Sequence, residues 1–338
     1  MAVAGYYGFG NLGDELLAEA AITALLRCGV EKERIVLMSA APEESRQKFG
    51  VDSINRWKVL QVCGTLRQSE TLLLGGGGLF QDVSSLLSCF YYWWLVRAAC
   101  FCGAVPWALG QSFGPFSTRT GPRLTRDALK RCRAVQVRDA ASEALCASLG
   151  LTVETGGDLA LSLADSFISQ AGGGKSKSPA RLLVNLRPGA GAQKLSERLA
   201  DAISACFHSS SFGGEFVGVA LSDEDERLMS RFNSEGRLPL SRIERIVALP
   251  DALRVFSGSA AVGMRLHFVM LAALAQIPLV AVPYDPKVES FAVGQNIPLW
   301  RDGALPPPRP ASFPRDFSPG RVRGEIDALC RKALYIEP

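Results

Sequence analysis

Short apolar runs alternate along this chain with longer segments in which apolar residues recur every three or four positions. The first pair is a predicted strand at 2–5 and a helix with apolar Leu16, Leu17, Ala20 and Leu25. The alternation continues through four further predicted strands, at 35–38, 71–74, 105–109 and 134–137. Strands separated by helices in this way are typical of a parallel, doubly wound sheet.

The same alternation restarts in the second half, after the glycine- and serine-rich stretch 170–179. Four more strands are predicted there, at 182–186, 216–220, 260–263 and 279–282. Because 338 residues exceed one ordinary core, we expect an α/β chain with Rossmann-like domains at 1–170 and 181–338 and a linker at 171–180. A helix predicted at 321–333 is a candidate to pack back on the first domain.

The most apolar segment, 86–102, reaches the roughly 20 residues of a membrane span only if Ser88 and Arg97 lie within it. We therefore expect a buried helix. Its aromatic run, 90–94, could touch a membrane surface or a lipid-linked substrate, but packing in the core and against another helix is the favoured alternative.

Composition excludes some functions. A net charge of +4 over 37 basic and 33 acidic residues is too mild and too scattered for a nucleic-acid surface. Nine cysteines without metal-type spacing, and no leader segment, favour reduced thiols in a cytoplasmic protein and predict no metal site.

Ligands of doubly wound sheets bind beyond the carboxyl ends of the strands. The first such loop carries Gly8, Gly10 and Gly13 before a helix, which suits an anion but lacks the GxGxxG spacing of a dinucleotide site. Asp14 follows, either as an acid favoured in the first helical turn or as a general base.

The second loop holds four successive glycines, 75–78, which we expect to form a strand-to-helix turn whose bare backbone suits a sugar or phosphate. Gln81 and Asp82 are candidate polar groups for the acceptor.

Basic residues follow three other predicted strands. Arg138 follows the strand at 134–137, and a guanidinium there could clamp a carboxylate or phosphate; a surface pair with Asp139 is the alternative. Arg265 and His267 follow the strand at 260–263, and Lys287 follows the one at 279–282. These three predict one cationic pocket, with His267 as the acid/base candidate, although each alone is more often a solvated residue.

Several of these segments together resemble the polysaccharide pyruvyl transferases, in particular the bacterial cell-surface branch often called CsaB. The matching segments are Gly5-Tyr6-Tyr7-Gly8-Phe9-Gly10-Asn11-Leu12-Gly13-Asp14-Glu15, Leu74-Gly75-Gly76-Gly77-Gly78-Leu79-Phe80-Gln81-Asp82, Gly110-Gln111-Ser112-Phe113-Gly114-Pro115, Val137-Arg138-Asp139 and Gly263-Met264-Arg265-Leu266-His267.

The resemblance implies two Rossmann-like domains facing across a cleft, as in GT-B glycosyltransferases. It implies transfer of pyruvate from phosphoenolpyruvate to a sugar as a ketal, with release of phosphate and without a cofactor. The expected acceptor is an N-acetylmannosamine residue of a lipid-linked cell-wall glycan precursor, with possible peripheral contact at the cytoplasmic membrane face.

The resemblance also implies roles for individual residues. The donor would be held by Arg138, Arg187, Arg265 and Lys287. His267 would protonate it and Asp14 would be the base. The acceptor would lie against Asn11, Gly76, Gly77, Gln81 and Asp82. Two alternatives remain: a GT-B glycosyltransferase using a nucleotide sugar, and a non-catalytic protein that binds a glycan or nucleotide.

Overall fold

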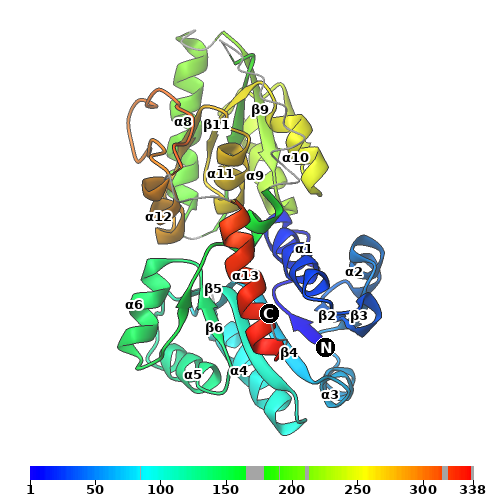
Figure 1. Cartoon of the computed structure of the whole chain (residues 1–338). Coiled ribbons are helices and arrows are strands. Elements are labelled where there is room, and N and C mark those ends of the chain that lie inside the picture. Colours follow the sequence, from blue (N-terminus) through cyan, green and yellow to red (C-terminus); the bar gives the residue numbers. More distant parts are fainter. Residues whose placement is uncertain (84, 165–178, 190, 210–212, 314–318, 336–338) are drawn as a thin grey trace. The chain divides into compact units, whose positions relative to one another are not determined.

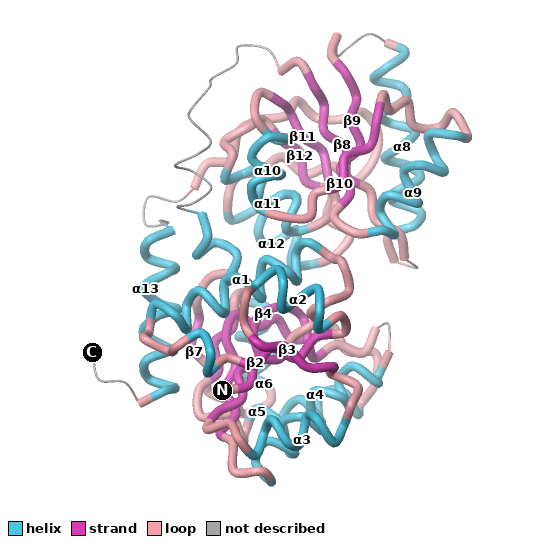
Figure 2. Tube along the Cα trace, turned by 90° about the vertical axis from the view of Figure 1, so that its right-hand side faces the viewer, coloured by secondary structure: helices cyan, strands magenta, loops and turns pink. Residues whose placement is uncertain are grey.

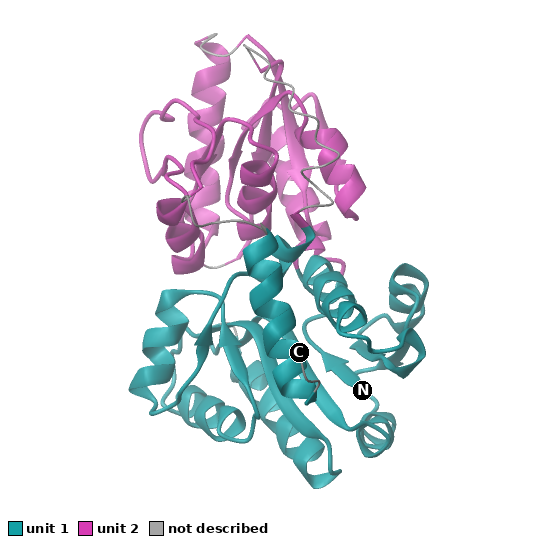
Figure 3. Ribbon diagram, viewed as in Figure 1, with its two compact units in different colours: residues 1–9, 14–163, 318–338 teal, residues 10–13, 164–317 magenta. Residues whose placement is uncertain are grey.

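The computed structural model of the chain describes residues 1–83, 85–164, 179–189, 191–209, 213–313 and 319–335. It divides into two compact units (Figure 3). Unit 1 comprises 1–9, 14–163 and 318–338, and unit 2 comprises 10–13 and 164–317. Most of the expected linker, 171–178, lies outside the described residues.

Unit 1 is built on a parallel sheet. Within the described residues its seven strands lie in the order β3-β2-β1-β4-β5-β6-β7. Their bounds are β1 Ala2–Ala4, β2 Val36–Ser39, β3 Asp52–Asn55, β4 Thr71–Phe80, β5 Val105–Phe113, β6 Val135–Val137 and β7 Glu154–Thr155. All neighbouring strands pair in parallel, for example with Val3 opposite Leu37 and Leu73.

Helices cover both faces of this sheet, with α3, α4 and α5 on one face and α1 and α13 on the other (Figure 2). The helices are α1 Leu12–Arg27, α2 Pro42–Phe49, α3 Val59–Arg67, α4 Leu86–Phe101, α5 Thr120–Leu129, α6 Ala140–Ser148 and α13 Pro319–Leu334, with short 3-10 turns η1 Lys32–Arg34 and η2 Leu159–Leu163. Residues 318–338, placed by sequence at the end of the second domain, thus group with unit 1, where Arg27 binds Asp327 of α13 through both Nε and Nη2.

Unit 2 repeats the same architecture. The strands described there lie in the order β10-β9-β8-β11-β12, all parallel. Their bounds are β8 Arg181–Asn185, β9 Glu215–Ala220, β10 Arg242–Arg245, β11 Ser259–Gly263 and β12 Leu279–Ala281. Helices α8 Gln193–His208 and α9 Asp223–Ser234 lie on one face, and α10 Leu249–Phe256, α11 Leu266–Leu274 and α12 Pro286–Gly294 on the other (Figures 1 and 2). The prediction of two parallel α/β sheets is confirmed.

Sequence analysis does not predict three of the strands: β3, β7 and β10. Each lies at the edge of its sheet. Their sequences, Asp-Ser-Ile-Asn, Glu-Thr and Arg-Ile-Glu-Arg, are short and charged. Edge strands are commonly charged because this discourages pairing with other chains, and the apolar run that marks a central strand is then missing.

The prediction of a glycine turn at 75–78 is wrong. Strand β4 continues through all four glycines to Phe80, and Gly75 and Gly77 still pair with Leu109 and Gln111 of β5. Gly76 and Gly77 have φ values of 58° and 95°, a region that residues with a Cβ seldom adopt. The register shifts after Gly77, so the glycines form an irregularity within the strand.

Helix α4 corresponds to the apolar segment 86–102. It is neither wholly buried nor a membrane span: Tyr92 and Leu95 are buried in the core of unit 1, whereas Leu87 and Phe90 are 75% and 52% exposed. Its side chains pack with those of α3 and α5. Among the described residues, no helix combines the length and apolarity needed to cross a bilayer.

Candidate functional site

The start of α11 in unit 2 is fixed by the neighbouring strand β8. Arg265, the residue before this helix, donates its backbone N–H to Asn185 Oδ1 at 2.9 Å. Asn185 is fully buried, and its amide donates to the carbonyl of Val219 in β9 at 2.9 Å. The Asn185 side chain thus joins the carboxyl ends of three strands, β11, β8 and β9, and fixes the position of the Arg265 backbone.

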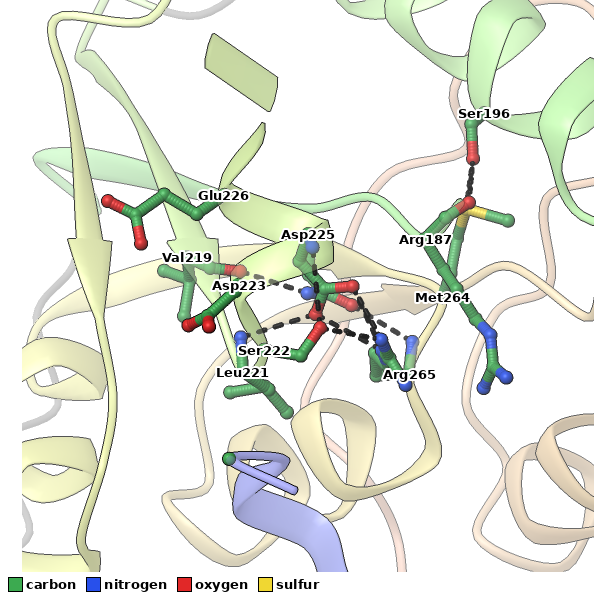
Figure 4. A network of polar contacts seen from close by, with 12 residues as sticks. Arg187, Ser196, Val219, Leu221, Ser222, Asp223, Asp225, Glu226, Met264 and Arg265 are labelled. Atoms are coloured by element: carbon green, nitrogen blue, oxygen red, sulfur yellow. Dashed lines mark hydrogen bonds and ion pairs between the residues drawn. The ribbon is translucent and has the colours of Figure 1, made fainter. Parts of the chain in front are cut away.

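The guanidinium of Arg265 is held by a buried carboxylate (Figure 4). Its Nη2 lies 2.6 Å from Asp225 Oδ1 and its Nε 3.1 Å from both carboxylate oxygens. The Asp225 side chain is fully buried and that of Arg265 is 11% exposed. Ser222 Oγ accepts a further bond from Nη2 at 2.8 Å. Such a fork-shaped contact fixes the plane of the guanidinium.

Asp225 was missed by sequence analysis. It lies in the first turn of α9, where Ser222 caps the helix by accepting from the Asp225 N–H. The signal was present, because Ser222 lies two residues after the end of β9 and four acidic residues follow it. The pattern was overlooked because an acid in the first turn of a helix is ordinarily explained by the helix dipole.

His267 lies in the first turn of α11 and its ring packs against Gly13. A Cβ atom at position 13 would lie 2.1 Å from His267 Nδ1, closer than atoms can approach. Residues 10–13 belong to unit 2 and make two more contacts within it: Leu12 N–H donates to the Leu221 carbonyl at 2.8 Å, and Arg245 Nη2 to that of Gly10 at 2.7 Å. Asn11 and Gly13 therefore lie within unit 2, with His267.

Two more predicted donor ligands follow β8 and β12, the strands on either side of β11. Arg187 donates to the Tyr284 hydroxyl, and its guanidinium carbon lies 4.8 Å from the centre of that ring. Lys287 Nζ lies 3.2 Å from Asp285 Oδ2, and Asp285 also caps α12. Burial raises the pKa of Tyr284, against the opposing effects of Arg187 and Arg265. Both arginines therefore lie close enough to influence this hydroxyl.

Arg138 belongs to unit 1 and forms a second buried ion pair. Its Nη1 binds Asp158, and the two side chains are 5% and 7% exposed. Its Nε donates to Ser112 Oγ at 2.6 Å, and that hydroxyl donates to Asp139. Asp139 itself caps α6. The alternative of a surface pair between Arg138 and Asp139 is thus replaced by a buried contact with Asp158, which sequence analysis missed because β7 before it was not recognised.

Asp14 lies beside the glycine irregularity of β4. A Cβ atom at position 77 would lie 3.8 Å from Asp14 Oδ1. Tyr7, from the loop before α1, is fully buried and donates to the Gly75 carbonyl. Burial, then Tyr92 and Asp14, raises the pKa of Tyr7 well above its usual range. Gly76 packs between Leu17 and Leu159. A Cβ atom at position 76 would lie 3.0 Å from side-chain atoms of both leucines.

Asp82 holds a loop of its own unit. It is 5% exposed and accepts bonds from the Ser117 and Thr118 N–H groups and from the Thr118 hydroxyl. Burial raises its pKa, but these hydrogen bonds outweigh burial and lower it below the usual value. Gln81 accepts from the Val83 N–H at 3.2 Å. The acceptor roles predicted for both stay predictions.

Comparison with known families gives one decisive match. A family model described as polysaccharide pyruvyl transferase matches residues 11–286. The chain belongs to the polysaccharide pyruvyl transferase family. The resemblance drawn from the sequence motifs is confirmed at this level, and the protein is a transferase whose family acts on a sugar or glycan acceptor. A search of curated proteins gave no match.

Solved structures similar to this pyruvyl transferase share its fold at low sequence identity. UDP-GlcNAc 2-epimerase from Methanocaldococcus jannaschii has a TM-score of 0.63 at 11% identity, covering 97% of this chain and 99% of its own. UDP-N-acetylglucosamine 2-epimerase from Rickettsia bellii has a TM-score of 0.58 at 9%, covering 99% and 95%. A glycosyltransferase from Rickettsia africae ESF-5 has a TM-score of 0.54 at 12%, covering 98% and 88%.

The predicted site residues of this pyruvyl transferase lie in both units. Unit 2 holds Arg187, Arg265, His267 and Lys287 at the carboxyl ends of three adjacent strands, together with Asn11. Unit 1 holds Asp14 with Gly77, and separately the Arg138 pair. Within the described part of the chain, no group of three or more His, Cys, Asp or Glu side chains could hold a metal ion.

Proposed function

We propose that this protein transfers pyruvate from phosphoenolpyruvate to an N-acetylmannosamine residue of a lipid-linked glycan precursor. The observation that carries the proposal is the set of basic groups at one sheet edge of unit 2: Arg187 after β8, Arg265 and His267 after β11, and Lys287 after β12. A carboxylate and a phosphate on one small donor require this density of cationic donors, assisted by the N–H groups at the start of α11.

In this proposal His267, protonated, gives its proton to the methylene carbon of phosphoenolpyruvate. The second carbon then becomes electrophilic, and a sugar hydroxyl attacks it while Asp14 accepts the hydroxyl proton. Breaking of the carbon–oxygen bond to phosphate and attack by a second hydroxyl close the ketal. His267 has given one proton to what is now the methyl group. One of the two hydroxyl protons returns to His267 in its place, and the other leaves with phosphate.

Fixed cations suit this reaction because negative charge builds on the departing phosphate. Arg265 is oriented before the donor binds, since Asp225 and Ser222 hold its guanidinium. Arg187 is held similarly by Tyr284. Arg138 is proposed as a further donor ligand, and Asn11, Gly76, Gly77, Gln81 and Asp82 as the acceptor side.

We further propose that the reaction needs neither metal nor cofactor and takes place in the cytoplasm, where phosphoenolpyruvate is made, at the membrane face carrying the lipid-linked acceptor. Unchanged phosphate release after chelation supports metal independence. Loss of release that a divalent ion restores contradicts it.

The test is phosphate release from phosphoenolpyruvate, with and without an N-acetylmannosamine-terminated lipid-linked acceptor. We expect acceptor-dependent release, and a fall of about 10²- to 10⁴-fold in His267→Ala, which is the usual contribution of a positioned acid. His208→Ala is the control, because His208 is exposed at the end of α8. If no glycan tried supports phosphate release and a nucleotide sugar is turned over, the protein is a glycosyltransferase instead.

A further inference from the structure

Exposed aromatic rings surround a buried arginine at the carboxyl edge of the unit 1 sheet. Arg56, directly after β3, is only 3% exposed. Its guanidinium carbon lies 4.5 to 5.9 Å from the centres of the rings of Tyr6, Phe9, Trp57, Tyr91 and Tyr92. Three of these rings remain open to solvent: Tyr6, Phe9 and Trp57 are 46%, 39% and 59% exposed. We refer to Tyr6, Phe9 and Trp57 as the aromatic platform.

Ring stacking and contacts with Arg56 hold the platform rings in place. Tyr6 and Phe9 stack with their centres 4.0 Å apart and their planes 13° from parallel. Arg56 donates to the Gly5 carbonyl at 2.6 Å and to the Tyr92 hydroxyl at 3.1 Å. The backbone N–H of Trp57 donates to Asn55 Oδ1 at 2.9 Å. The cation–ring contacts and hydrogen bonds therefore fix the rings before any ligand arrives.

The platform adjoins the candidate base of the proposed reaction. Tyr6 and Phe9 lie in the loop between β1 and α1, and Asp14 lies in the first turn of α1 that follows this loop. Tyr92, which binds Arg56, is fully buried; burial, and to a smaller extent Tyr91 and the charge of Asp14, raise its pKa against the opposing effect of Arg56. The rings and the carboxylate are therefore parts of one edge of one unit, at the strand ends where doubly wound sheets bind ligands.

We propose that the aromatic platform binds a pyranose ring of the glycan acceptor by stacking, and that Arg56 positions the rings. A pyranose presents a face of C–H groups that packs flat on an aromatic ring, whose face is electron-rich. Rings fixed in advance bind such a face without loss of side-chain freedom. The inference rests on the proposed function only for the reaction that follows binding, since the family already implies a sugar acceptor.

A bilayer surface is the other class of partner that exposed aromatic rings can suit. The geometry favours a sugar, because Tyr6 and Phe9 stack on each other and all three platform rings lie around a buried cation rather than along a helix face. Arg56 is enclosed and hydrogen-bonded, so its charge is not presented to anionic headgroups. Binding to vesicles is therefore an outcome that the experiment must distinguish.

The test compares Phe9→Ala and Trp57→Ala with Phe101→Ala, a matched control in the same unit that is 86% exposed at the far end of α4. We expect each platform variant to raise the acceptor KM about two- to tenfold, the usual worth of one aromatic contact. The phosphoenolpyruvate KM and the melting temperature should stay unchanged. The control should match the wild type in all three.

A second measurement does not depend on the reaction. Saturation-transfer NMR with a methyl N-acetylmannosaminide should show transfer from the wild type and from Phe101→Ala, and weaker transfer from Phe9→Ala and Trp57→Ala. If phosphate release fails but this pattern holds, the donor assignment is wrong and the platform stands. If the saccharide signal is equal in all variants or absent from the wild type, or if the variants lose only co-sedimentation with lipid vesicles, the platform proposal is overturned.

Discussion

Gly13 and His267 show how closely one residue constrains another in this transferase. The imidazole occupies the space that any side chain at position 13 would need, with its Nδ1 2.1 Å from the position of a Cβ. A glycine is therefore required at position 13 by its neighbour.

We expect Gly13→Ala to lower kcat for phosphate release by about 100-fold, because a displacement of roughly 1 Å at a reacting group costs that much. Gly64→Ala is the control. It also lies inside a helix, α3, but a Cβ there would meet nothing within 4 Å. The control should keep its kcat and gain about 0.5 to 1 kcal/mol of stability, because alanine favours a helix over glycine.

A Gly13→Ala variant with unchanged kcat would contradict the placement of His267 as the acid. Circular dichroism should show that both variants are folded, so that a loss of activity is not a loss of structure.

At the scale of elements, Asp82 ties the end of β4 to the loop before α5. Its carboxylate accepts three bonds from Ser117 and Thr118. In Asp82→Asn one acceptor becomes an N–H donor that faces those donors. We expect unfolding to become easier by about 1 to 3 kcal/mol at pH 7. Asp52→Asn, at an exposed pair with Arg46, should cost about 0 to 1 kcal/mol.

The effect of Asp82→Asn should depend on pH. Because the pKa of Asp82 is lowered in the folded protein, its contribution is fully present above the unfolded pKa of about 4 and is lost as pH falls through the folded value. Urea unfolding of wild type and variant should therefore differ most at neutral pH and converge in acid. A difference that stays constant down to pH 2 would mean that the charge is unimportant.

At the scale of the whole molecule, each unit has its own sheet and core, and the last helix belongs to unit 1. Leu329 of α13 is 1% exposed, and α13 packs against η2 and β5. We expect Leu329→Ala to destabilise unit 1 by about 2 to 5 kcal/mol, the usual cost of such a cavity. Hydrogen exchange followed by mass spectrometry should speed up in β4 and β5 and stay unchanged in β8 and β11.

Leu87→Ala is the matched control, since Leu87 is 75% exposed on α4. It should leave exchange in both sheets unchanged. Equal acceleration in the two sheets of Leu329→Ala would show instead that the units unfold together, which two separate cores do not require.

The local pattern of the sequence determined the two parallel sheets and the loops that carry chemistry. Buried central strands are continuous apolar runs, and in such sheets the residues after each strand lie at the ligand edge. Arg138, Arg265, His267 and Lys287 could thus be located before the structure was known. The continuation of β4 through 75–78 could not, because glycines predict a turn unless a neighbouring strand pairs with them.

Only the tertiary structure decided what each of these residues contacts. Arg265 and Asp225 are 40 residues apart in sequence, and Arg56 meets rings from three separate segments. Periodicity reports which face of an element is buried, but it carries no information on which distant side chain completes an ion pair or encloses a cation. Those partners follow from the order of strands in the sheet, which brings the segments to one edge.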